Sequence, residues 1–171
     1  MSSNKKPDNS IPSAGKLQHE LKKKKPFESL AQEAWLNLVR THSQLQIRGE
    51  RMLAEFGLTG CQYNILRILR GEGHPLPILE VASRTISPVP GITGLIDRLE
   101  KAGWVCRERS TTDRRVIYVG ITDPALELLS KIDQPLNDLH EEIMQPLSQG
   151  DRRELIRLLE QLRCHASEHP E

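Results

Sequence analysis

The sequence predicts a mainly α-helical fold with a small β wing, and the stretch from Gly91 to Arg115 carries most of the evidence. Apolar residues at helical spacing indicate a helix that buries one face, at Ile92, Leu95, Ile96 and Leu99. Gly103 ends this helix, as a glycine just past the last periodic residue commonly does. Two β-prone runs, 104–108 and 116–119, then flank a turn that carries Arg114 and Arg115. A helix that leads directly into a hairpin with a cationic tip is typical of a winged helix, an element that usually binds nucleic acid.

Three further helices are predicted before this stretch. Residues 1–26 are polar and contain three prolines, so we expect a disordered basic leader. A long helix is expected from Glu28 to Phe56, and Gly57 ends it. Thr59 and Gln62 have the spacing of a capping box, which opens a helix that extends to Arg70. After a break rich in glycine and proline, a short helix is expected over residues 78–84.

Two prolines set the expected start of the fourth helix. Val89 precedes Pro90, and a residue before proline avoids the α region. The sequence therefore predicts Pro90 as the first helical residue, where a missing N–H costs nothing, and a helix that extends to Ala102.

The C-terminal part predicts two more helices after the β hairpin. Thr122 is the expected N-cap of the first one, with Pro124 in its first turn. Apolar residues then alternate by three and four positions, which is typical of a coiled-coil-like seam, at Leu129, Ile132, Leu136, Leu139 and Ile143. Because the seam continues beyond Pro135, we expect that proline to kink the helix rather than end it. The last helix begins at Asp151, followed by a disordered tail at 166–171, and presents on one face Leu155, Leu159 and Leu162.

Composition excludes several classes of protein. The 171 residues suffice for one domain with a sizeable core. No run of about 18 apolar residues exists, so no membrane-spanning helix is expected, and the first residues lack the apolar stretch of a secretory signal. The three cysteines are widely spaced and odd in number, which does not suit a disulfide framework. These features predict a cytoplasmic protein without membrane association.

The net charge of +1 conceals an uneven distribution. Residues 1–27 carry +5, residues 28–73 balance at zero, residues 74–121 carry +2 and residues 122–171 carry −6. A basic head and middle with an acidic tail can orient a molecule on a polyanion. The alternative for Lys22 to Lys25 is that these lysines merely solvate a disordered leader.

Over residues 28–164 the chain resembles the MarR (multiple antibiotic resistance regulator) family of bacterial winged helix-turn-helix transcriptional regulators. Residues 113–122 fit the wing signature of that family, an aspartate, any residue, an arginine, then valine and Leu-Thr at fixed offsets, with Ile121 in place of the usual leucine. Residues 58–62 and 97–103 supply supporting matches in the right order. The resemblance implies a homodimer with a helical dimerisation region, here 27–56 and 122–165, and a winged helix-turn-helix DNA-binding region, here 57–121. The apolar residues of the seam and of the last helix are the expected dimerisation residues, namely Leu129, Ile132, Leu136, Leu139, Ile143, Leu155, Leu159 and Leu162.

The resemblance also implies how DNA is bound. The fourth helix would enter the major groove and the wing the neighbouring minor groove, so that a dimer binds a pseudo-palindromic double-stranded DNA operator. The expected DNA-binding residues are Ser87, Val89, Gly91, Thr93, Gly94, Arg98, Arg114 and Arg115. The family often has a polar or basic side chain where Gly94 stands. We therefore expect the backbone to approach the DNA closely, with more reliance on groove shape than on long side chains.

The wing arginines are the strongest of these candidates. A carboxylate can aim a neighbouring guanidinium, and arginine is favoured where the minor groove narrows, so we expect Asp113 to hold Arg115. The alternative is a solvated turn with a weak surface ion pair. Arg98, late in the helix, is a candidate for a phosphate contact, whereas Ser87 either bonds to DNA or caps the helix.

Three other candidate sites carry weaker signals. The resemblance implies a pocket for a small aromatic or phenolic ligand, for which Trp35, His42 and Tyr63 are candidates that core packing explains equally well. Cys61 lies in the first turn of a helix, where a thiolate is favoured, although an inert cysteine is the better interpretation. The His165 and His169 pair suits a shared ion, but surface histidines explain it better, so we expect no metal and no cofactor.

No catalytic motif is present, because the sequence lacks a phosphate loop with its lysine, Cys-x-x-Cys, Gly-x-Ser-x-Gly and His-Glu-x-x-His. The absence of these motifs predicts that the chain is not an enzyme, and the resemblance implies a transcriptional regulator, a repressor that binds DNA as a homodimer. Two alternatives stay open: a winged-helix module that binds protein instead of DNA, and a cysteine-based redox-responsive regulator.

Overall fold

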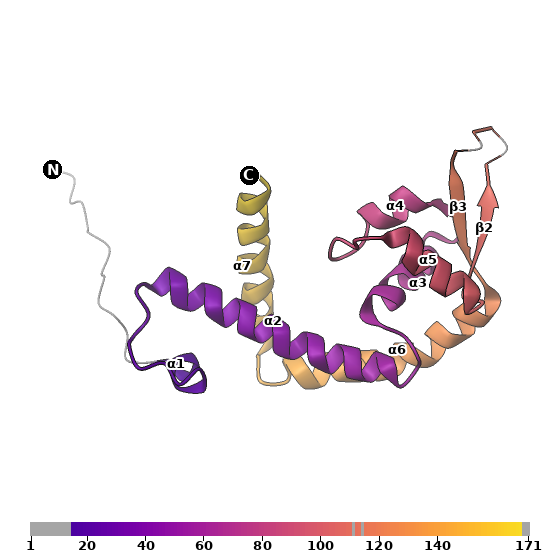
Figure 1. The fold of residues 1–171 in the computed structure, drawn as a ribbon. Helices are drawn as coiled ribbons and strands as arrows, with labels where there is room; N and C mark the ends of the chain where they lie inside the picture. The colour runs from indigo at the N-terminus through magenta and orange to yellow at the C-terminus, as the bar shows by residue number, and fades with distance from the viewer. Residues whose placement is uncertain (1–14, 111, 114, 169–171) are drawn as a thin grey trace. The chain divides into compact units, whose positions relative to one another are not determined.

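A computed structural model describes residues 15–110, 112–113 and 115–168. The disorder expected for residues 1–14 and 169–171 lies outside these described residues, whereas residues 166–168, also expected to be disordered, belong to the last helix. Within them the chain forms seven helices and three short strands (Figure 1), which confirms a mainly α-helical fold with a small β wing. The chain divides into two compact units, residues 1–48 and 49–171, and helix α2 (Leu30–Ala54) contributes to both.

The first unit contains a short helix that was not predicted from the sequence. Helix α1 (Lys16–Glu20) lies within the leader that was expected to be disordered. Leu17 is buried there, and so is Phe27. These apolar residues are too far apart among lysines to give a periodic signal, yet their burial is enough to order the turn between them. The expectation of disorder is therefore wrong for residues 16–20.

Helix α2 fills most of the predicted range. Ser29 Oγ accepts a hydrogen bond from the Gln32 N–H (3.1 Å), while Gln32 Oε1 accepts one from the Glu28 N–H (2.9 Å). These reciprocal bonds satisfy N–H groups that have no partner within the helix, which explains the start at Leu30. Gly57 follows the last turn with φ of +73°, in the left-handed region.

The second unit is built around helix α3 (Gly60–Glu72), whose predicted capping box is confirmed. The Thr59 hydroxyl accepts from the Gln62 N–H (3.3 Å), and the Gln62 side chain accepts from the Thr59 N–H (2.9 Å). Glu50 adds a further acceptor for the Gly60 N–H (3.0 Å). The largest fully buried side chains form the core around α3, namely Ile65, Leu66, Leu69, Val81, Ile96, Leu99, Val119, Leu129 and Ile132.

Helices α4 (Ile78–Ser83) and α5 (Ile92–Lys101) form the predicted helix-turn-helix. The expectation that Pro90 is the first helical residue is wrong. Gly91 takes φ of +67° at the N-cap, and this left-handed residue turns the chain so that the helix begins at Ile92. Gly91 offers what proline cannot, because its lack of a Cβ permits positive φ. The predicted buried stripe is confirmed at Leu95, Ile96 and Leu99.

Three antiparallel strands form the wing sheet in the order β1–β3–β2. Strands β2 (Val105–Arg109) and β3 (Ile117–Ile121) form the predicted hairpin, with Arg107 opposite Val119. Strand β1 (Leu76–Pro77) pairs with β3 and was not predicted. A two-residue strand that contains proline has no alternation to detect, and it is tolerated here because it lies at a sheet edge.

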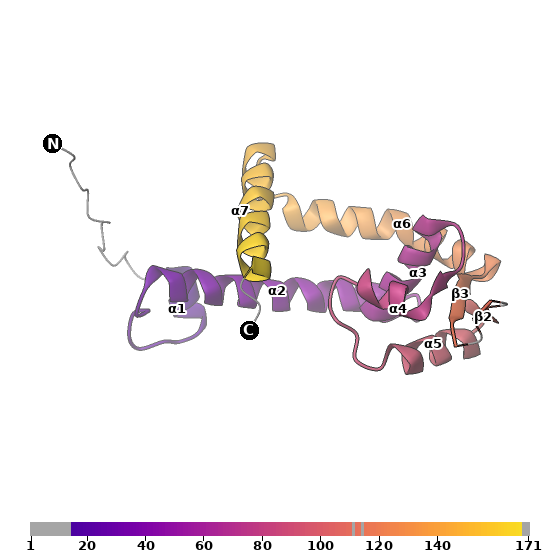
Figure 2. The same cartoon turned by 90° about the horizontal axis from the view of Figure 1, so that it is seen from above.

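Helices α6 (Asp123–Met144) and α7 (Gln149–Glu168) complete the second unit (Figure 2). Helix α6 continues through Pro135 as predicted. Thr122 is the N-cap residue, but its hydroxyl donates to the Gly103 carbonyl (2.8 Å) and makes no capping bond. None of the described helices is long and apolar enough to cross a membrane.

The seam predicted along α6 serves two different roles. Leu129 and Ile132 have no exposed surface and belong to the core beneath α3, so they are unavailable to a second chain. Leu136 packs partly against the same core, while Leu139 and Ile143 are half-buried. The prediction of dimerisation residues therefore needs correction at Leu129 and Ile132, because heptad spacing cannot tell a neighbouring helix of the same chain from a partner chain.

Candidate nucleic-acid interface

The face of α5 that points away from the core carries small and charged residues. Thr93, Asp97 and Arg98 are exposed, and Gly94 lies between them on the same face. Figure 1 shows α5 beside the base of the hairpin formed by β2 and β3. The helix and the wing therefore form one side of the second unit.

Gly94 is not required by the protein's own packing. A Cβ built on Gly94 would meet nothing within 4 Å, and its φ lies outside the left-handed region. Glycine within a helix is less stable than alanine by roughly 0.5–1 kcal/mol. Neither the packing of the protein nor the backbone conformation requires a glycine at this position. The missing side chain would, however, let another molecule approach the helix closely from outside.

Arg107 on β2 holds the charged residues of α5 in place, a role that was not predicted from the sequence. Its guanidinium donates to Glu100 Oε2 (3.2 Å) and to the Thr93 carbonyl (3.1 Å), and it pairs with the Asp97 carboxylate. The Arg107 Nε is buried and has no hydrogen-bond partner among the described residues. One cation thus joins the wing to α5 and offsets part of the charge of two exposed carboxylates. The alternation of side chains along β2 could have indicated this inward position, because Arg107 lies on the same strand face as the buried Val105.

The wing presents Arg115 in the geometry that the sequence predicted. The Asp113 carboxylate accepts from the Arg115 backbone N–H (3.0 Å), from its Nε (3.2 Å) and from its Nη2 (3.3 Å). These hydrogen bonds from Arg115 lower the pKa of Asp113. The Arg115 side chain is 92% exposed, so the contact orients the guanidinium without removing it from solvent. Arg114 lies outside the described residues.

The other predicted DNA-binding residues differ in exposure. Ser87 in the loop before α5 is exposed, as is Arg98 late in the helix. Val89 is half-buried and packs against the core, so its side chain anchors the loop instead of pointing fully outward.

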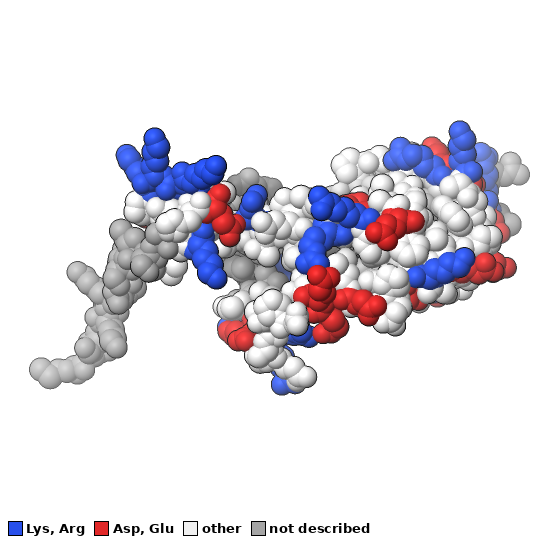
Figure 3. Space-filling view, turned by 90° about the horizontal axis from the view of Figure 1, so that it is seen from below, with Lys and Arg blue, Asp and Glu red and all other residues white. Residues whose placement is uncertain are grey.

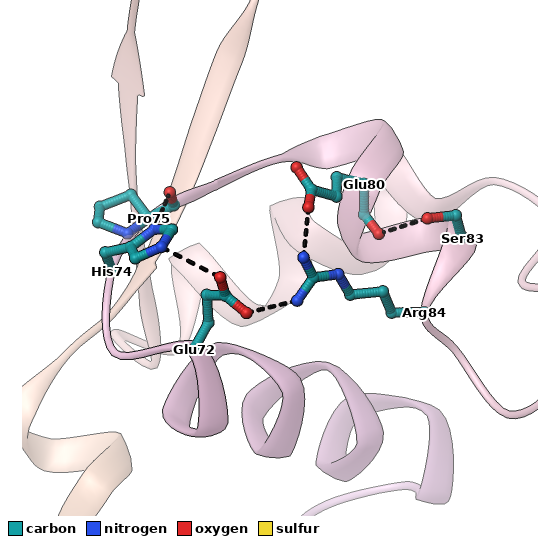
Figure 4. Close-up of polar contacts among 6 residues, drawn as sticks. All are labelled: Glu72, His74, Pro75, Glu80, Ser83 and Arg84. Carbon is teal, nitrogen blue, oxygen red and sulfur yellow. Dashed lines mark hydrogen bonds and ion pairs between the residues drawn. The ribbon is translucent and has the colours of Figure 1, made fainter.

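A network of charged side chains fixes the first helix of the helix-turn-helix (Figure 4). Arg84, just after α4, pairs with both Glu72 of α3 and Glu80 of α4, and His74 Nε2 lies 3.1 Å from Glu72 Oε1. The hydrogen bond from Arg84 is the main cause that lowers the pKa of Glu72. The network therefore fixes Arg84, the residue at which the loop to α5 begins.

Helices α3 and α6 are joined by a second ion pair. The Arg70 guanidinium donates two hydrogen bonds to the Asp133 carboxylate, at 2.9 Å and 2.8 Å. The hydrogen bond with Asp133 raises the pKa of Arg70. Burial raises the pKa of the neighbouring Tyr63, and the nearby Arg70 opposes that change.

The ligand-pocket candidates lie on two different helices. Trp35 is 65% exposed and His42 is exposed, both on α2, whereas Tyr63 on α3 is half-buried against the core. Cys61 is exposed at the second residue of α3. Among the described residues, no group of three histidine, cysteine or acidic side chains is arranged to hold a metal ion.

Comparison with known proteins yields consistent matches. The sequence model of the MarR family matches residues 58–117, from the start of α3 into the wing. The HTH-type transcriptional regulator YkoM of Bacillus subtilis is 31% identical over 113 residues, which cover 66% of this chain and 72% of YkoM. The crystal structure of a MarR transcription factor from Planctomyces limnophilus is 40% identical, with a TM-score of 0.63 over 78% of this chain and 98% of that one. A MarR mutant from Escherichia coli, solved in complex with operator DNA, shares the fold at 23% identity, with a TM-score of 0.64 over 75% of this chain and 95% of that one.

Proposed function

We propose that this chain, which belongs to the MarR family of transcriptional regulators, represses transcription by binding a pseudo-palindromic operator as a homodimer. It is a DNA-binding regulator and not an enzyme. In this proposal α5 enters the major groove, and the wing places Arg115 and Arg114 in the neighbouring minor groove.

Two observations together carry the proposal: no protein atom lies within 4 Å of a Cβ built on Gly94, and Arg115 on the wing is oriented and exposed. A helix with small residues at its leading end can lie close to the floor of a groove, where backbone groups and Thr93 reach base edges or phosphates. Arg98 would contact the phosphate backbone from the same face. Arg107 supports the proposal because its positive charge offsets part of the negative charge that Asp97 and Glu100 would present to a polyanion.

Selection of bound sequences from a random DNA pool tests this function. We expect a two-fold symmetric consensus, because each subunit of a dimer would bind one half-site. Arg115→Ala should then lower the affinity for the selected duplex, while Arg153→Ala, which removes an exposed arginine from α7, serves as the control of equal charge. If the wild-type protein retains no DNA, the proposed function is wrong and a protein-binding module becomes the better interpretation.

The exposed apolar surface of α7 supports the dimer. Four large apolar side chains of this helix are between 37% and 58% exposed, namely Leu155, Ile156, Leu158 and Leu162. Such a surface is unfavourable in water and is commonly covered by a partner. With Leu139, Ile143 and Leu159, these residues form the proposed dimer contact. Light scattering of Leu162→Lys should show a loss of dimer relative to the wild-type chain.

Release of DNA by a small aromatic ligand is the remaining part of the proposal. An organohalide-sensing regulator solved in its 2,4-dichlorophenol-bound form shares the fold, at 18% identity and a TM-score of 0.75. Trp35 and His42, both exposed on α2, offer ring stacking and hydrogen bonds to such a ligand. Phenolic acids added to the preformed DNA complex should lower DNA binding, and Trp35→Ala should abolish that effect.

A further inference from the structure

The lysine-rich segment of the first unit has a defined fold. Helix α1 ends in a Schellman motif, in which the Lys22 N–H donates to the His19 carbonyl (3.0 Å) and the Lys23 N–H donates to the Gln18 carbonyl (3.0 Å). Buried Leu17 and Phe27 lie at the two ends of the segment. We call residues 16–27 the lysine turn.

Lys22 occupies a position where glycine would be more stable. Its φ is +50°, and it is the only described residue other than glycine with positive φ. The residue after the C-cap of a Schellman motif is usually glycine, because a Cβ disfavours the left-handed region. The chain therefore keeps a cationic side chain at a strained position, which the fold of the turn does not require.

One lysine of the turn folds back onto the backbone, whereas the other four are exposed. Lys23 Nζ donates to the carbonyls of Lys25 (3.1 Å) and Pro26 (2.9 Å) and lies 5.3 Å from the centroid of the Phe27 ring. The remaining four lysines are exposed, and no acidic side chain among the described residues pairs with Lys16, Lys22, Lys24 or Lys25. The acid of the turn, Glu20, lies 3.9 Å from Arg40 instead. Figure 3 shows basic side chains gathered on this segment, at the left of the view.

We propose that the lysine turn binds the phosphate backbone of DNA, through residues other than those of α5 and the wing. The inference rests on the proposed function, since it assumes that the chain binds DNA. Lysine ammonium groups are compact donors that suit phosphate oxygens without demanding a fixed geometry. Four exposed cations within ten residues, Lys16 to Lys25, match the closely spaced charges of a duplex, which carries one negative charge per about 1.7 Å of its axis. The contact adds affinity without reading sequence.

An acidic protein surface is the alternative occupant, and residues 122–171 of this chain carry −6. The phosphate backbone is favoured because the turn holds its cations by backbone geometry, and Leu21, at 43% exposed, is the one large apolar side chain of the turn that a protein partner could cover. Its buried apolar side chains, Leu17 and Phe27, are used internally.

The test measures binding of the full-length protein to a labelled duplex obtained by the pool selection, over a series of salt concentrations. Lys24→Gln with Lys25→Gln removes two exposed cations, and Lys131→Gln with Arg153→Gln removes two exposed cations from α6 and α7 as the matched control. Removing one phosphate contact should reduce the slope of log K against log salt by about 0.9. We expect the turn variant to lower the slope by at least about 1 and the affinity at 0.1 M salt by about tenfold, and the control to change neither.

Lys22→Gly separates charge from folding. Glycine relieves the strain at φ of +50°, so the variant should unfold at the same or a higher temperature than the wild-type chain while its DNA affinity falls. If the turn variants and the control have the same salt slope while Arg115→Ala still weakens binding, the lysine turn does not contact DNA and only this inference fails. If the turn variants leave DNA binding intact but weaken the dimer, the acidic segment is its occupant and the inference is likewise overturned. A wild-type protein that binds no DNA would refute the proposed function as well.

Discussion

Replacing Gly94 with alanine should stabilise the folded protein and at the same time weaken its binding to DNA. Gly94 is the third residue of α5, and a Cβ added there meets no protein atom within 4 Å. Alanine is therefore free of clashes and reduces the conformational entropy of the unfolded chain. Because the residue lies in the first turn, we take the low end of the usual range, about 0.5 kcal/mol. In a chain of this size that gain raises the melting temperature by about 1–2 °C.

The expected effect on DNA binding has the opposite sign. If the backbone of α5 lies against the groove at Gly94, the added methyl group occupies space that the DNA needs. Inserting a methyl group into a close-packed contact costs about 1–3 kcal/mol. The affinity for the selected duplex should therefore fall between about fivefold and more than a hundredfold.

Gly71→Ala provides the matched control. Gly71 lies in α3, is exposed, and also has nothing within 4 Å of a built Cβ. Thermal unfolding and fluorescence anisotropy with the same labelled duplex give both quantities for both variants. Equal affinities for Gly94→Ala and Gly71→Ala would refute the close approach of α5 to DNA, whatever the change in melting temperature.

Three further predictions concern the ion pairs around the interface. In an NMR titration, the pKa of the Asp113 carboxyl should lie below its ordinary range and should return toward that range in Arg115→Ala, because Arg115 causes the lowered pKa. The contact that orients Arg115 is therefore complete at neutral pH and is lost as the pH falls through the depressed pKa of Asp113. Removal of Arg70 and Asp133, singly and together, should give a coupling of about 0.5–1 kcal/mol in denaturant unfolding, since both side chains are partly exposed; full additivity would show that the pair contributes nothing. Arg107→Ala should lower DNA affinity more than Arg115→Ala does in anisotropy titrations, because it leaves two carboxylates of α5 without their cation; an unchanged affinity would show that those carboxylates do not face the DNA.

The sequence predicted those elements whose signal lies within a few neighbouring residues. The capping box of Thr59 and Gln62 and the buried stripe of α5 depend on spacings of three and four, and both are present. The contact between Asp113 and Arg115 spans two residues and was predicted for the same reason. Local patterns fix these features because the interacting groups are close along the chain.

The features that the sequence did not predict depend on contacts across the fold. Strand β1 exists because β3 offers an edge more than forty residues later in the chain. Leu129 and Ile132 follow a seam that suits a partner chain, yet α3 covers them first. The start of α5 depends on the left-handed conformation of Gly91, whereas the two prolines before it favoured a helix start at Pro90. Residue spacing alone cannot predict these three features, because each depends on contacts or backbone conformations that the local sequence pattern does not reveal.

Arg107 shows most clearly how such a contact bears on the proposed interface. Asp97 and Glu100 place negative charge on a helix that we propose faces a polyanion, and by sequence alone they argue against that role. The guanidinium of Arg107 pairs with both carboxylates from the adjacent strand, which offsets part of their charge, and it also donates to the Thr93 carbonyl at the leading end of the helix. The carboxylates therefore serve as anchors that fix α5 against the wing. Since one side chain sets the position of both elements, a change at Arg107 should disturb major-groove and minor-groove contacts together, whereas a change at Arg115 should disturb the minor-groove contact alone.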